Sequence, residues 1–441
     1  GRPTAETEAV SGLQRTWTYP VNSATGVQET QRYDAVPRTN TLVARNARGV
    51  ETSRTTTIAT NVTVTRSVAD SEGGRDAADR WKSATIQRTG QAAVTETRTI
   101  DGAGRLTAQS GAGLSAAASY SYDEVTRRKS AESIPLSLSG TVAGDYGYYA
   151  DGRLERGHIC GIAFFLAYDS AGNLVGDNQN STTRDFTYDE ANRLQEMVKD
   201  GASTVYGWDE DNGWRTSQGP SADPDEVQVT YNAQGRMASY SDSSQDVSAT
   251  YTYDAAGQRT KSVVDWGGSV MTTDWAYDGI KLMSLKSSWS GTTYRIDYLY
   301  DEEDRPYGGV YRSPATSTSP TYFTIVTSDR GDVLELLDSA GSPFAAYRYD
   351  VWGNRIGAGQ NYGSHIWTQG TGLVSLSTAN HIVDWQALMY AGYCYDWESG
   401  FYYCSARYYD PETRQFTSRD PAAADGAESA YQYASGSPTL A

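Results

Sequence analysis

Few side chains in this sequence could carry out chemistry, and the cysteines are the first candidates. Cys394 and Cys404 flank a turn-like segment, so they could face each other across a hairpin and form a disulfide in an oxidising compartment. The alternative is a pair of small apolar residues beneath a sheet. Cys160 has no partner nearby in the sequence, and we expect it to be buried and unreactive. With 3 cysteines in 441 residues, this is not a disulfide-scaffold protein.

Metal ligands are the second candidates. The 3 histidines share no spacing typical of a metal site. His158 and Cys160 alternate, so a strand would place both on one face, but zinc would need two further ligands. The acidic clusters at 209–212 and 301–304 are rich in oxygen atoms yet lack the calcium-loop pattern. We interpret these clusters as solvated loop tips and predict neither a metal nor a cofactor.

The elements that would position any site follow from a repeat. A degenerate Tyr-x-Tyr-Asp-x-x-Gly-Arg-Leu string recurs from about residue 100 to residue 353, and its starts between Ile100 and Tyr300 lie 20 to 26 residues apart. Such regular spacing indicates one supersecondary unit stacked many times. The clearest copies are Tyr168, Asp169 and Gly172; Tyr188 and Asp189; Tyr253, Asp254 and Gly257; and Tyr349, Asp350 and Gly353.

Each copy of the repeat predicts a β-hairpin. Aromatic residues at alternate positions, such as Tyr251 and Tyr253, face one side of a strand. The Asp begins a type I turn, where its carboxylate accepts hydrogen bonds from backbone amides two residues on. The Gly three residues later takes the left-handed conformation of a bulged hairpin loop. Asn192 and Asn212 stand where this Gly is expected, and Asn is the next most tolerant residue at positive φ.

The composition sets limits on fold and function. Tyr occurs 33 times and Phe 7 times, and a Tyr-rich sheet can pack its rings while its hydroxyl groups stay hydrated. The hydrophobic share of 38% and the mean hydropathy of −0.59 favour a sheet with much hydrated surface on both faces. The net charge of −17 disfavours nucleic-acid binding, and no apolar run reaches membrane-spanning length.

Three zones divide the chain. Residues 1–115 lack the Tyr signature, and we interpret them as divergent strands of the same unit. Residues 116–325 hold the regular array. Residues 326–441 change character, with Trp residues, paired Tyr residues and two Asp-Pro steps. Helix signals are scarce throughout, which predicts an all-β protein.

The array and the last zone carry a family resemblance. The array resembles the YD repeats of bacterial Rhs proteins, of related wall-associated toxins, of the C component of insecticidal toxin complexes and of animal teneurins. The last zone is similar to the Rhs-associated core at residues 328–334, 338–341, 347–350, 392–396, 400–403, 406–411 and 418–421. This resemblance implies tandem β-hairpins that form one long sheet, which spirals into a hollow shell and ends in the core. A β-propeller with two units to a blade is the alternative architecture.

The resemblance also implies an activity. In toxin-bearing relatives, the shell encloses a C-terminal toxic polypeptide, and the core releases it by aspartate-dependent self-cleavage. Asp420 would be half of the self-cleaving pair, because two carboxylates in one site can act as acid and base. The alternative is an ordinary Asp-Pro turn, since Ala423 stands where the family has Gly. The second motif of the pair is expected beyond Ala441, so the cleavage site would lie outside this chain.

These observations leave three functional hypotheses. The first is a structural, non-enzymatic shell segment of a secreted or cell-surface protein, whose partner is a C-terminal toxin or other cargo polypeptide. The second is an adhesion or carbohydrate-binding module whose Tyr and Trp side chains contact a cell-surface glycan or protein. The third is a core that cuts its own chain once. No nucleic acid, membrane span, metal or cofactor is expected in any of them.

Overall fold

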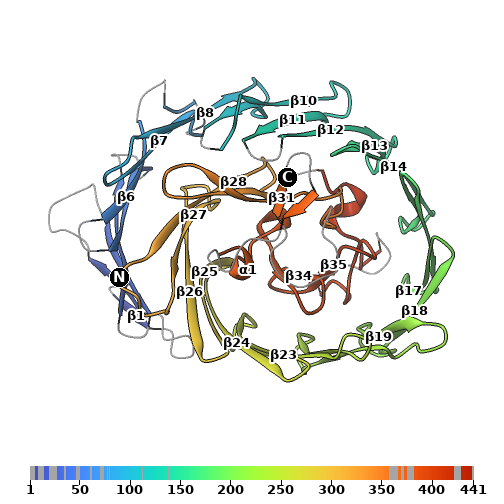
Figure 1. The fold of residues 1–441 in the computed structure, drawn as a ribbon. Helices are drawn as coiled ribbons and strands as arrows, with labels where there is room; N and C mark the ends of the chain where they lie inside the picture. Colours follow the sequence, from blue (N-terminus) through green and yellow to red (C-terminus); the bar gives the residue numbers. More distant parts are fainter. Residues whose placement is uncertain are drawn as a thin grey trace.

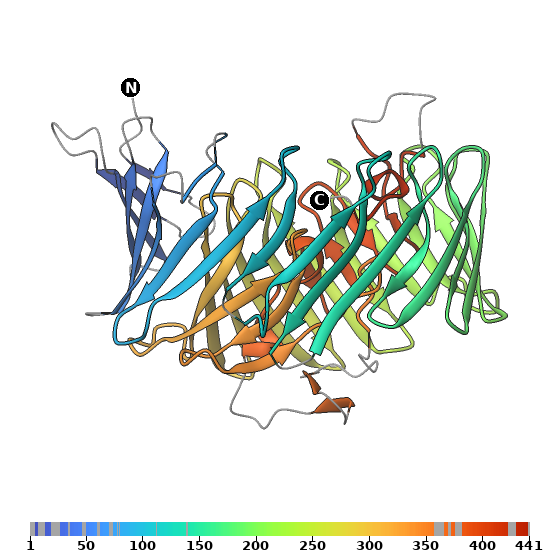
Figure 2. The ribbon, with the colours of Figure 1, turned by 90° about the horizontal axis from the view of Figure 1, so that it is seen from above.

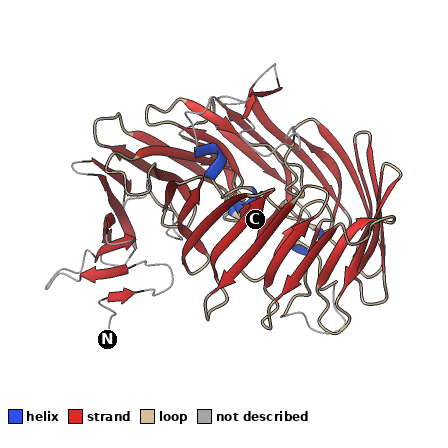
Figure 3. Cartoon of the chain, turned by 60° about the horizontal axis from the view of Figure 1, so that its bottom comes forward, coloured by secondary structure: helices blue, strands red, loops and turns tan. Residues whose placement is uncertain are grey.

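The chain is built almost entirely of β-strands, as Figure 3 shows for the computed structural model. The described residues are 5–7, 14–18, 27–33, 36–45, 50–59, 62–69, 74–76, 78, 80–111, 113–137, 140–356, 366–368, 372–374, 382–421 and 429–439. The first ten strands are β1 (Ala5–Thr7), β2 (Gln14–Thr18), β3 (Val27–Tyr33), β4 (Val36–Arg45), β5 (Glu51–Ala59), β6 (Val62–Val68), β7 (Ser83–Arg88), β8 (Val94–Ile100), β9 (Leu106–Ser110) and β10 (Ala118–Tyr122).

The regular array and the elements after it continue this order. The next ten strands are β11 (Lys129–Leu136), β12 (Gly140–Tyr148), β13 (Leu154–Ile159), β14 (Ile162–Tyr168), β15 (Leu174–Gln179), β16 (Thr182–Tyr188), β17 (Leu194–Lys199), β18 (Ala202–Trp208), β19 (Arg215–Pro220) and β20 (Val227–Tyr231). Then come β21 (Met237–Asp242), β22 (Val247–Tyr253), β23 (Arg259–Trp266), β24 (Ser269–Asp278), β25 (Lys281–Trp289), β26 (Thr292–Tyr300), β27 (Pro306–Arg312), β28 (Thr321–Thr327), β29 (Val333–Leu337) and β30 (Pro343–Ala346). The last elements are β31 (Ile366–Thr368), β32 (Gly372–Val374), α1 (Ile382–Trp385), η1 (Tyr390–Gly392), β33 (Cys394–Asp396), β34 (Phe401–Tyr403), β35 (Tyr408–Asp410), β36 (Gln415–Phe416) and η2 (Ala434–Gly436).

The main sheet is a single meander. Each strand from β1 to β30 pairs antiparallel with the next strand along the chain. Figure 2 shows these strands running obliquely side by side, with their turns along two rims. The turns that follow even-numbered strands lie on one rim, here called the repeat rim. This continuous sheet confirms the predicted all-β shell architecture, in which tandem hairpins pair edge to edge.

The repeat turn is organised by its Asp. At Asp169, Oδ1 accepts hydrogen bonds from the amides of Ala171 (2.9 Å) and Asn173 (2.8 Å). The Asp169 carbonyl accepts another from the amide of Gly172 (3.1 Å), whose φ of +86° is costly for any residue with a Cβ. The same closing bond joins Asp189 to Asn192, Asp254 to Gly257 and Asp350 to Gly353. These bonds lie within one turn, so the local sequence fixes the conformation of each repeat turn.

The prediction that Asn212 takes the left-handed position of the turn Gly is wrong. Asn192 has the positive φ of +61° that the turn needs, but Asn212 does not adopt a left-handed conformation. Instead Gly213 has φ +68°, and its amide donates to the Asp209 carbonyl (2.9 Å). This turn is one residue longer than the repeat pattern, so the left-handed position moves from Asn212 to the Gly that follows it.

The motif tyrosine joins one hairpin to the hairpin before it. The Tyr188 hydroxyl donates to the Leu174 carbonyl (2.7 Å), and Leu174 directly begins the strand after the preceding repeat turn. Equivalent bonds run from Tyr122 to Leu106, from Trp208 to Leu194, from Tyr253 to Met237, from Tyr300 to Leu282 and from Tyr349 to Val333. Phe could fill the same space but could not donate this bond. This geometry gives a physical reason for the preference for Tyr at this position.

Only one face of the sheet is hydrated along the array. In β14, Phe164 and Leu166 are buried while Phe165 between them is 60% exposed, and β22 alternates in the same way around buried Tyr251. The buried face belongs to a core that also contains residues of the C-terminal segment, such as Phe401. The expectation of hydrated surface on both faces is therefore wrong. Tyr, Arg and Thr fill much of the interior, which is why the mean hydropathy is low.

The sheet spirals past its own beginning. In Figure 1 it runs around the molecule and continues inside its first strands, so that β27 and β28 lie within the wall near β6 and β7. Ile58 and Val64 of the outer turn pack against Val310 and Tyr322 of the inner turn. Arg312 also donates to the Ile58 carbonyl (3.0 Å). We call this two-layered region the seam.

The interior of the spiral holds the end of the chain. Residues 382–421 and 429–439, here called the C-terminal plug, contain α1 and a separate four-stranded sheet of β33 to β36. Figure 1 shows this part of the chain surrounded by the wall. Ring contacts such as Tyr240 with Phe401 and Tyr251 with Tyr408 join the wall to the plug.

Candidate functional site

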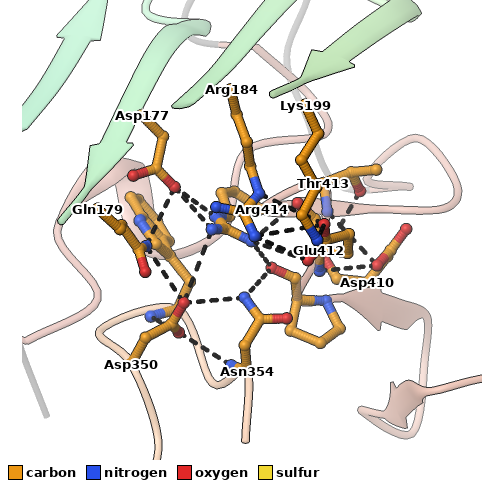
Figure 4. Close-up of polar contacts among 12 residues, drawn as sticks. Asp177, Gln179, Arg184, Lys199, Asp350, Asn354, Asp410, Glu412, Thr413 and Arg414 are labelled. Atoms are coloured by element: carbon orange, nitrogen blue, oxygen red, sulfur yellow. Dashed lines mark hydrogen bonds and ion pairs between the residues drawn. The ribbon is translucent and has the colours of Figure 1, made fainter. Parts of the chain in front are cut away.

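The most elaborate polar site of the described residues lies where the plug meets the wall. Arg414, only 1% exposed, donates to Asp177 Oδ2 from Nε (2.9 Å) and from Nη2 (2.6 Å). Its Nη2 atom also lies 3.6 Å from Asp350 Oδ2. Figure 4 shows these side chains converging from three parts of the chain: β15, the turn after β30, and the plug. Asp177 and Asp350 are themselves 0% and 4% exposed, so all three charges are removed from water.

Glu412 extends this site toward the neighbouring strands. Its carboxylate contacts Arg184 Nη2 (3.2 Å) in β16 and Lys199 Nζ (2.8 Å) in β17. Burial works against ionisation of Glu412, but Arg414, Arg184 and Lys199 outweigh it and lower its pKa to about 2. Burial likewise opposes the charge of Arg414, yet Asp177, Asp350 and Glu412 raise its pKa above the ordinary value. We call Arg414, Glu412, Asp177, Asp350, Arg184 and Lys199 the Arg414 network.

A second buried pair fastens the other side of the plug. Arg259 in β23 is fully buried and binds Asp396 of β33 with both terminal nitrogens, at 2.8 Å for Nη2 to Oδ1. The guanidinium also contacts the Tyr408 hydroxyl (3.1 Å) and lies over the Trp275 ring (4.3 Å). Burial opposes the Arg259 charge, but Asp396 outweighs it and the pKa of Arg259 lies well above its ordinary value. A third pair joins Arg215 to Asp410 at 2.8 Å.

Glu398 is a buried carboxyl of the plug whose pKa is raised, whereas that of Glu412 is lowered. It accepts a hydrogen bond from the Tyr251 hydroxyl (2.7 Å), and no salt bridge to it is found among the described residues. Burial, helped by repulsion from Asp396, raises the pKa of Glu398 to about 7. Near neutral pH this carboxyl therefore exchanges a proton, whereas Glu412 stays ionised.

The repeat residues predicted from sequence occupy the wall, and some of them reach the plug. Asp350 serves both its own turn, through Trp352 and Asn354, and the Arg414 network. The Tyr168 hydroxyl donates to the Gly436 carbonyl of the plug (3.2 Å). Asp169, Gly172, Tyr188, Asp189, Tyr253, Asp254, Gly257, Tyr349 and Gly353 take part in the repeat turns and inter-hairpin bonds described above.

Asp420 lies at the repeat rim rather than in the Arg414 network. Its Oδ2 atom accepts a hydrogen bond from Arg407 Nη2 (2.9 Å), and its amide donates to the Ala430 carbonyl. It lines a pocket of about 490 Å³ together with Trp214 and Arg236. Residues 422–428, which follow it, lie outside the described residues, so the self-cleavage role of Asp420 stays a prediction.

The cysteines have no reactive arrangement. Cys394 pairs with Tyr403 across the β33–β34 hairpin, and Cys404 lies one residue beyond the end of β34 rather than opposite Cys394. Both thiols are free, as is Cys160, and the disulfide that the sequence left open is not formed. Burial raises the pKa of Cys394 to about 12 and that of Cys160 to about 11, which keeps both thiols protonated.

Two further classes of site can be addressed within the described part of the chain. No group of three or more His, Cys, Asp or Glu residues there is arranged to hold a metal ion. No helix there is long and apolar enough to cross a membrane.

Sequence reasoning missed the ion pairs of the plug. The sequence singled out none of Arg414, Asp177 and Arg259. A signal existed for one partner: an Arg within an otherwise aromatic, turn-rich segment is expensive to bury alone and so requires a buried carboxylate. Nothing in the sequence identifies which carboxylate.

Comparison of the sequence with known proteins gives a consistent result. Residues 77–366 match the family described as Teneurin YD-shell. The tRNA3(Ser)-specific nuclease WapA of Bacillus spizizenii is 28% identical over 297 residues, which are 65% of this chain and 11% of that protein. The double-stranded DNA deaminase toxin A of Burkholderia cenocepacia is 26% identical over 298 residues, which are 61% of this chain and 18% of that protein. This chain thus spans less than a fifth of these relatives.

Solved structures share the fold at low sequence identity. The crystal structure of TcdB2-TccC3-Cdc42 superposes with a TM-score of 0.57 at 14% identity, covering 100% of this chain and 27% of that chain. The Tc holotoxin pore of Photorhabdus luminescens gives a TM-score of 0.58 at 13% identity, covering 100% of this chain and 26% of that one. The sequence match, the continuous hairpin meander and these superpositions agree: the chain belongs to the Teneurin YD-shell family and forms a shell segment of the Rhs type.

Proposed function

We propose that this chain is the closed end of a shell that encloses or presents a C-terminal polypeptide. The observation that carries the proposal is the position of the last described residues. Thr439 is 2% exposed and its hydroxyl lies 2.8 Å from that of Tyr148 in β12, while Arg330 Nη1 donates to the Pro438 carbonyl (2.6 Å). A polypeptide that continues from this point begins inside the wall.

The plug supports this function because it fixes where such a polypeptide starts. The Arg414 network and the Arg259–Asp396 pair attach the plug to widely separated strands of the wall, and the Arg414–Asp177 and Arg259–Asp396 pairs are buried. Breaking one member of such a pair leaves a buried charge without a partner, which strongly disfavours withdrawal of the plug. The attachment therefore suits long-lived retention rather than rapid exchange.

The relatives indicate the class of protein. They are named for a tRNA nuclease and a DNA deaminase toxin, and this chain matches only 11% and 18% of their lengths. We assign this chain to the shell of such a protein rather than to its catalytic part, and we place the protein outside the cell or on its surface. The cargo would be a toxic polypeptide joined to the C-terminal end of the plug.

The aromatic side chains argue for a structural use rather than glycan binding. Among the tryptophans whose burial the structure describes, only Trp289 is exposed, at 40%, and Trp81, Trp275 and Trp352 are buried. The plug tyrosines stack on one another, as in the 4.2 Å contact between the rings of Tyr409 and Tyr433. Rings used for internal packing are not free to stack on a sugar.

Protease protection of a fused polypeptide tests the proposal. An unstructured peptide with thermolysin sites is joined to Ala441, and its cleavage is timed in the native chain and in Arg414→Ala. We expect slow cleavage in the native fusion and at least about tenfold faster cleavage in Arg414→Ala, because the buried Asp177 loses its partner. The control is Arg156→Ala, an Arg that is 63% exposed on the wall.

The outcomes separate the alternatives. Cleavage of the native fusion as fast as that of the free peptide would overturn the enclosure of cargo. Equal protection in the native fusion and in Arg414→Ala, with the variant folded, would show that the Arg414 network does not hold the plug in place.

A further inference from the structure

A basic pocket lies in the seam, apart from the plug network. It has a volume of about 380 Å³ and is lined by residues from both turns of the spiral. The outer turn contributes Arg98 of β8 and Arg105 beside β9, and the inner turn contributes Arg305 beside β27. Thr439 of the plug closes one side. We call this cavity the seam pocket.

The charge of the seam pocket is unusual for this protein. Six cationic side chains line it against two carboxylates, although the whole chain carries a net charge of −17. The two carboxylates are already paired: Glu303 lies 2.6 Å from Arg98 Nη1 and Asp329 lies 2.6 Å from Lys129 Nζ. From outside the lining, Asp76 pairs with Arg80 (2.6 Å), Asp101 with Arg105 (2.7 Å) and Glu132 with Lys129 (3.2 Å). Five carboxylates thus stand against six cations, and the small positive surplus lies at the open side of the pocket, where Arg127 is exposed.

Two guanidinium groups keep unused donors at this site. Arg98 binds Glu303 through Nη1, and its buried Nε has no hydrogen-bond partner. Arg105 binds Asp101 through Nε (2.8 Å) and Nη2 (2.7 Å), and its buried Nη1 has no partner. Burial lowers the pKa of Arg98 and repulsion from Arg305 adds to this, even though Glu303 acts in the opposite direction. Buried donors without partners are costly, and a guanidinium recovers that cost best by binding an oxyanion.

The rest of the lining favours an organic anion over a bare ion. Ile100, Leu106 and the ring of Tyr122 form an apolar wall, and Arg105 lies 4.6 Å from the centre of that ring. A volume of this size suits a small molecule. Inorganic phosphate would leave the apolar wall uncovered.

We propose that the seam pocket binds a small organic oxyanion, a carboxylate or a phosphate ester that carries an apolar group. Its acidic end contacts the arginines, and its apolar end covers Ile100, Leu106 and Tyr122. Because the arginines come from both turns of the sheet, the ligand joins the outer turn to the inner turn. A ligand that binds only the closed arrangement stabilises it by mass action, so occupancy of the seam pocket strengthens closure of the shell.

Calorimetric titration with phenyl phosphate and benzoate tests this proposal, with benzamide as the neutral control. We expect one or both anions to bind and to raise the melting temperature, and benzamide to do neither. Arg105→Gln and Arg127→Gln are each expected to weaken binding by about tenfold, through loss of a charged donor. Arg127 lines the pocket at an exposed hairpin tip, so its variant keeps the test valid where Arg105→Gln disturbs folding.

Two controls make the result decisive. Arg156→Gln lies on the outer face and is expected to bind as the native chain does. A chain with a short Gly-Ser extension after Ala441 is expected to bind both anions with the affinity of the native chain. Tighter binding of phenyl phosphate assigns a phosphate ester, and tighter binding of benzoate assigns a carboxylate. Absence of binding by both anions, equal binding of benzamide, or equal weakening by Arg156→Gln would overturn the proposal.

Discussion

The contacts within the wall and the contacts that attach the plug to the wall differ in how far apart their partners lie in the sequence. In the wall, the Tyr188 hydroxyl reaches a carbonyl only 14 residues away, and the bond from Tyr300 spans 18 residues. In the plug, Arg259 binds a carboxylate 137 residues away, and Arg414 binds one 237 residues away. The wall can therefore grow one hairpin at a time, each unit supported by its neighbour. The plug can attach only after the strands that carry its partners are in place.

The chemistry of the contacts differs in the same way. Inter-hairpin bonds in the wall join neutral groups, and each contributes on the order of 1 kcal/mol. The plug contacts join fully buried charges, whose mutual attraction is largely offset by the cost of removing them from water. Such pairs add little net stability when intact but are costly to break from one side. The wall is thus stabilised by many hydrogen bonds that each contribute little. The plug is retained by a few buried ion pairs, each of which is lost when either partner is removed.

The largest expected effect comes from Arg259→Met. The change leaves Asp396 buried without its cation, so we expect the plug to lose about 3–5 kcal/mol of attachment. Hydrogen exchange should then accelerate at residues 394–410 while residues 162–199 of the wall stay protected. Adding Asp396→Leu should restore much of the loss, because both buried charges are then gone.

Arg156→Met is the matched control, since that Arg is 63% exposed. Equal acceleration of exchange in plug and wall would contradict the distinction drawn between them. So would a double variant that is no more stable than Arg259→Met alone.

An intermediate effect is expected from the pH dependence of Glu398. Its pKa is about 7 in the fold against an ordinary 4.5, so the folded chain binds this proton more tightly than the unfolded chain does. Stability from this group is complete below pH 4.5 and is lost as the pH rises to 7, by about 3 kcal/mol in total. Glu398→Gln should remove this loss, because the amide cannot ionise.

Urea unfolding of the native chain and of Glu398→Gln between pH 4.5 and pH 8 measures how the free energy of unfolding of each depends on pH. Glu412→Gln is the control with the opposite sign, because the pKa of Glu412 lies near 2 and its stabilisation is lost only in acid. A Glu398→Gln variant with the same pH dependence as the native chain would show that Glu398 ionises freely in the fold.

The contrast between wall and plug also explains what the sequence could predict. The turns could be recognised because Asp169 and Gly172 act within five residues of each other, and the shell fold followed from their spacing. Asp177 could not be recognised as a partner of Arg414, because 237 residues separate them and Asp177 belongs to no motif. The seam was equally hidden, since contact between Ile58 and Val310 depends on how tightly the sheet curls.

One local feature was overlooked although its signal was present. Each motif Tyr lies a nearly constant distance after the Leu of the previous copy, as Tyr188 does after Leu174. The hydroxyl group of the motif Tyr and the regular position of the first residue of the preceding strand together predict a hydrogen bond between neighbouring hairpins. The burial of one face of the sheet was missed because composition alone suggested a sheet hydrated on both faces.

The smallest expected effect tests the wall itself. Tyr188→Phe removes the donor to the Leu174 carbonyl without changing the packing of the ring, so we expect a loss of about 1 kcal/mol. Tyr253→Phe removes the equivalent bond to Met237, and the two sites share no contact, so their losses should add. Hydrogen exchange should accelerate only near each substituted hairpin, because nearest-neighbour terms do not reach distant repeats. A loss in the double variant well above the sum, or faster exchange in the plug after either change, would mean that the wall unfolds as one unit and that its difference from the plug is one of degree.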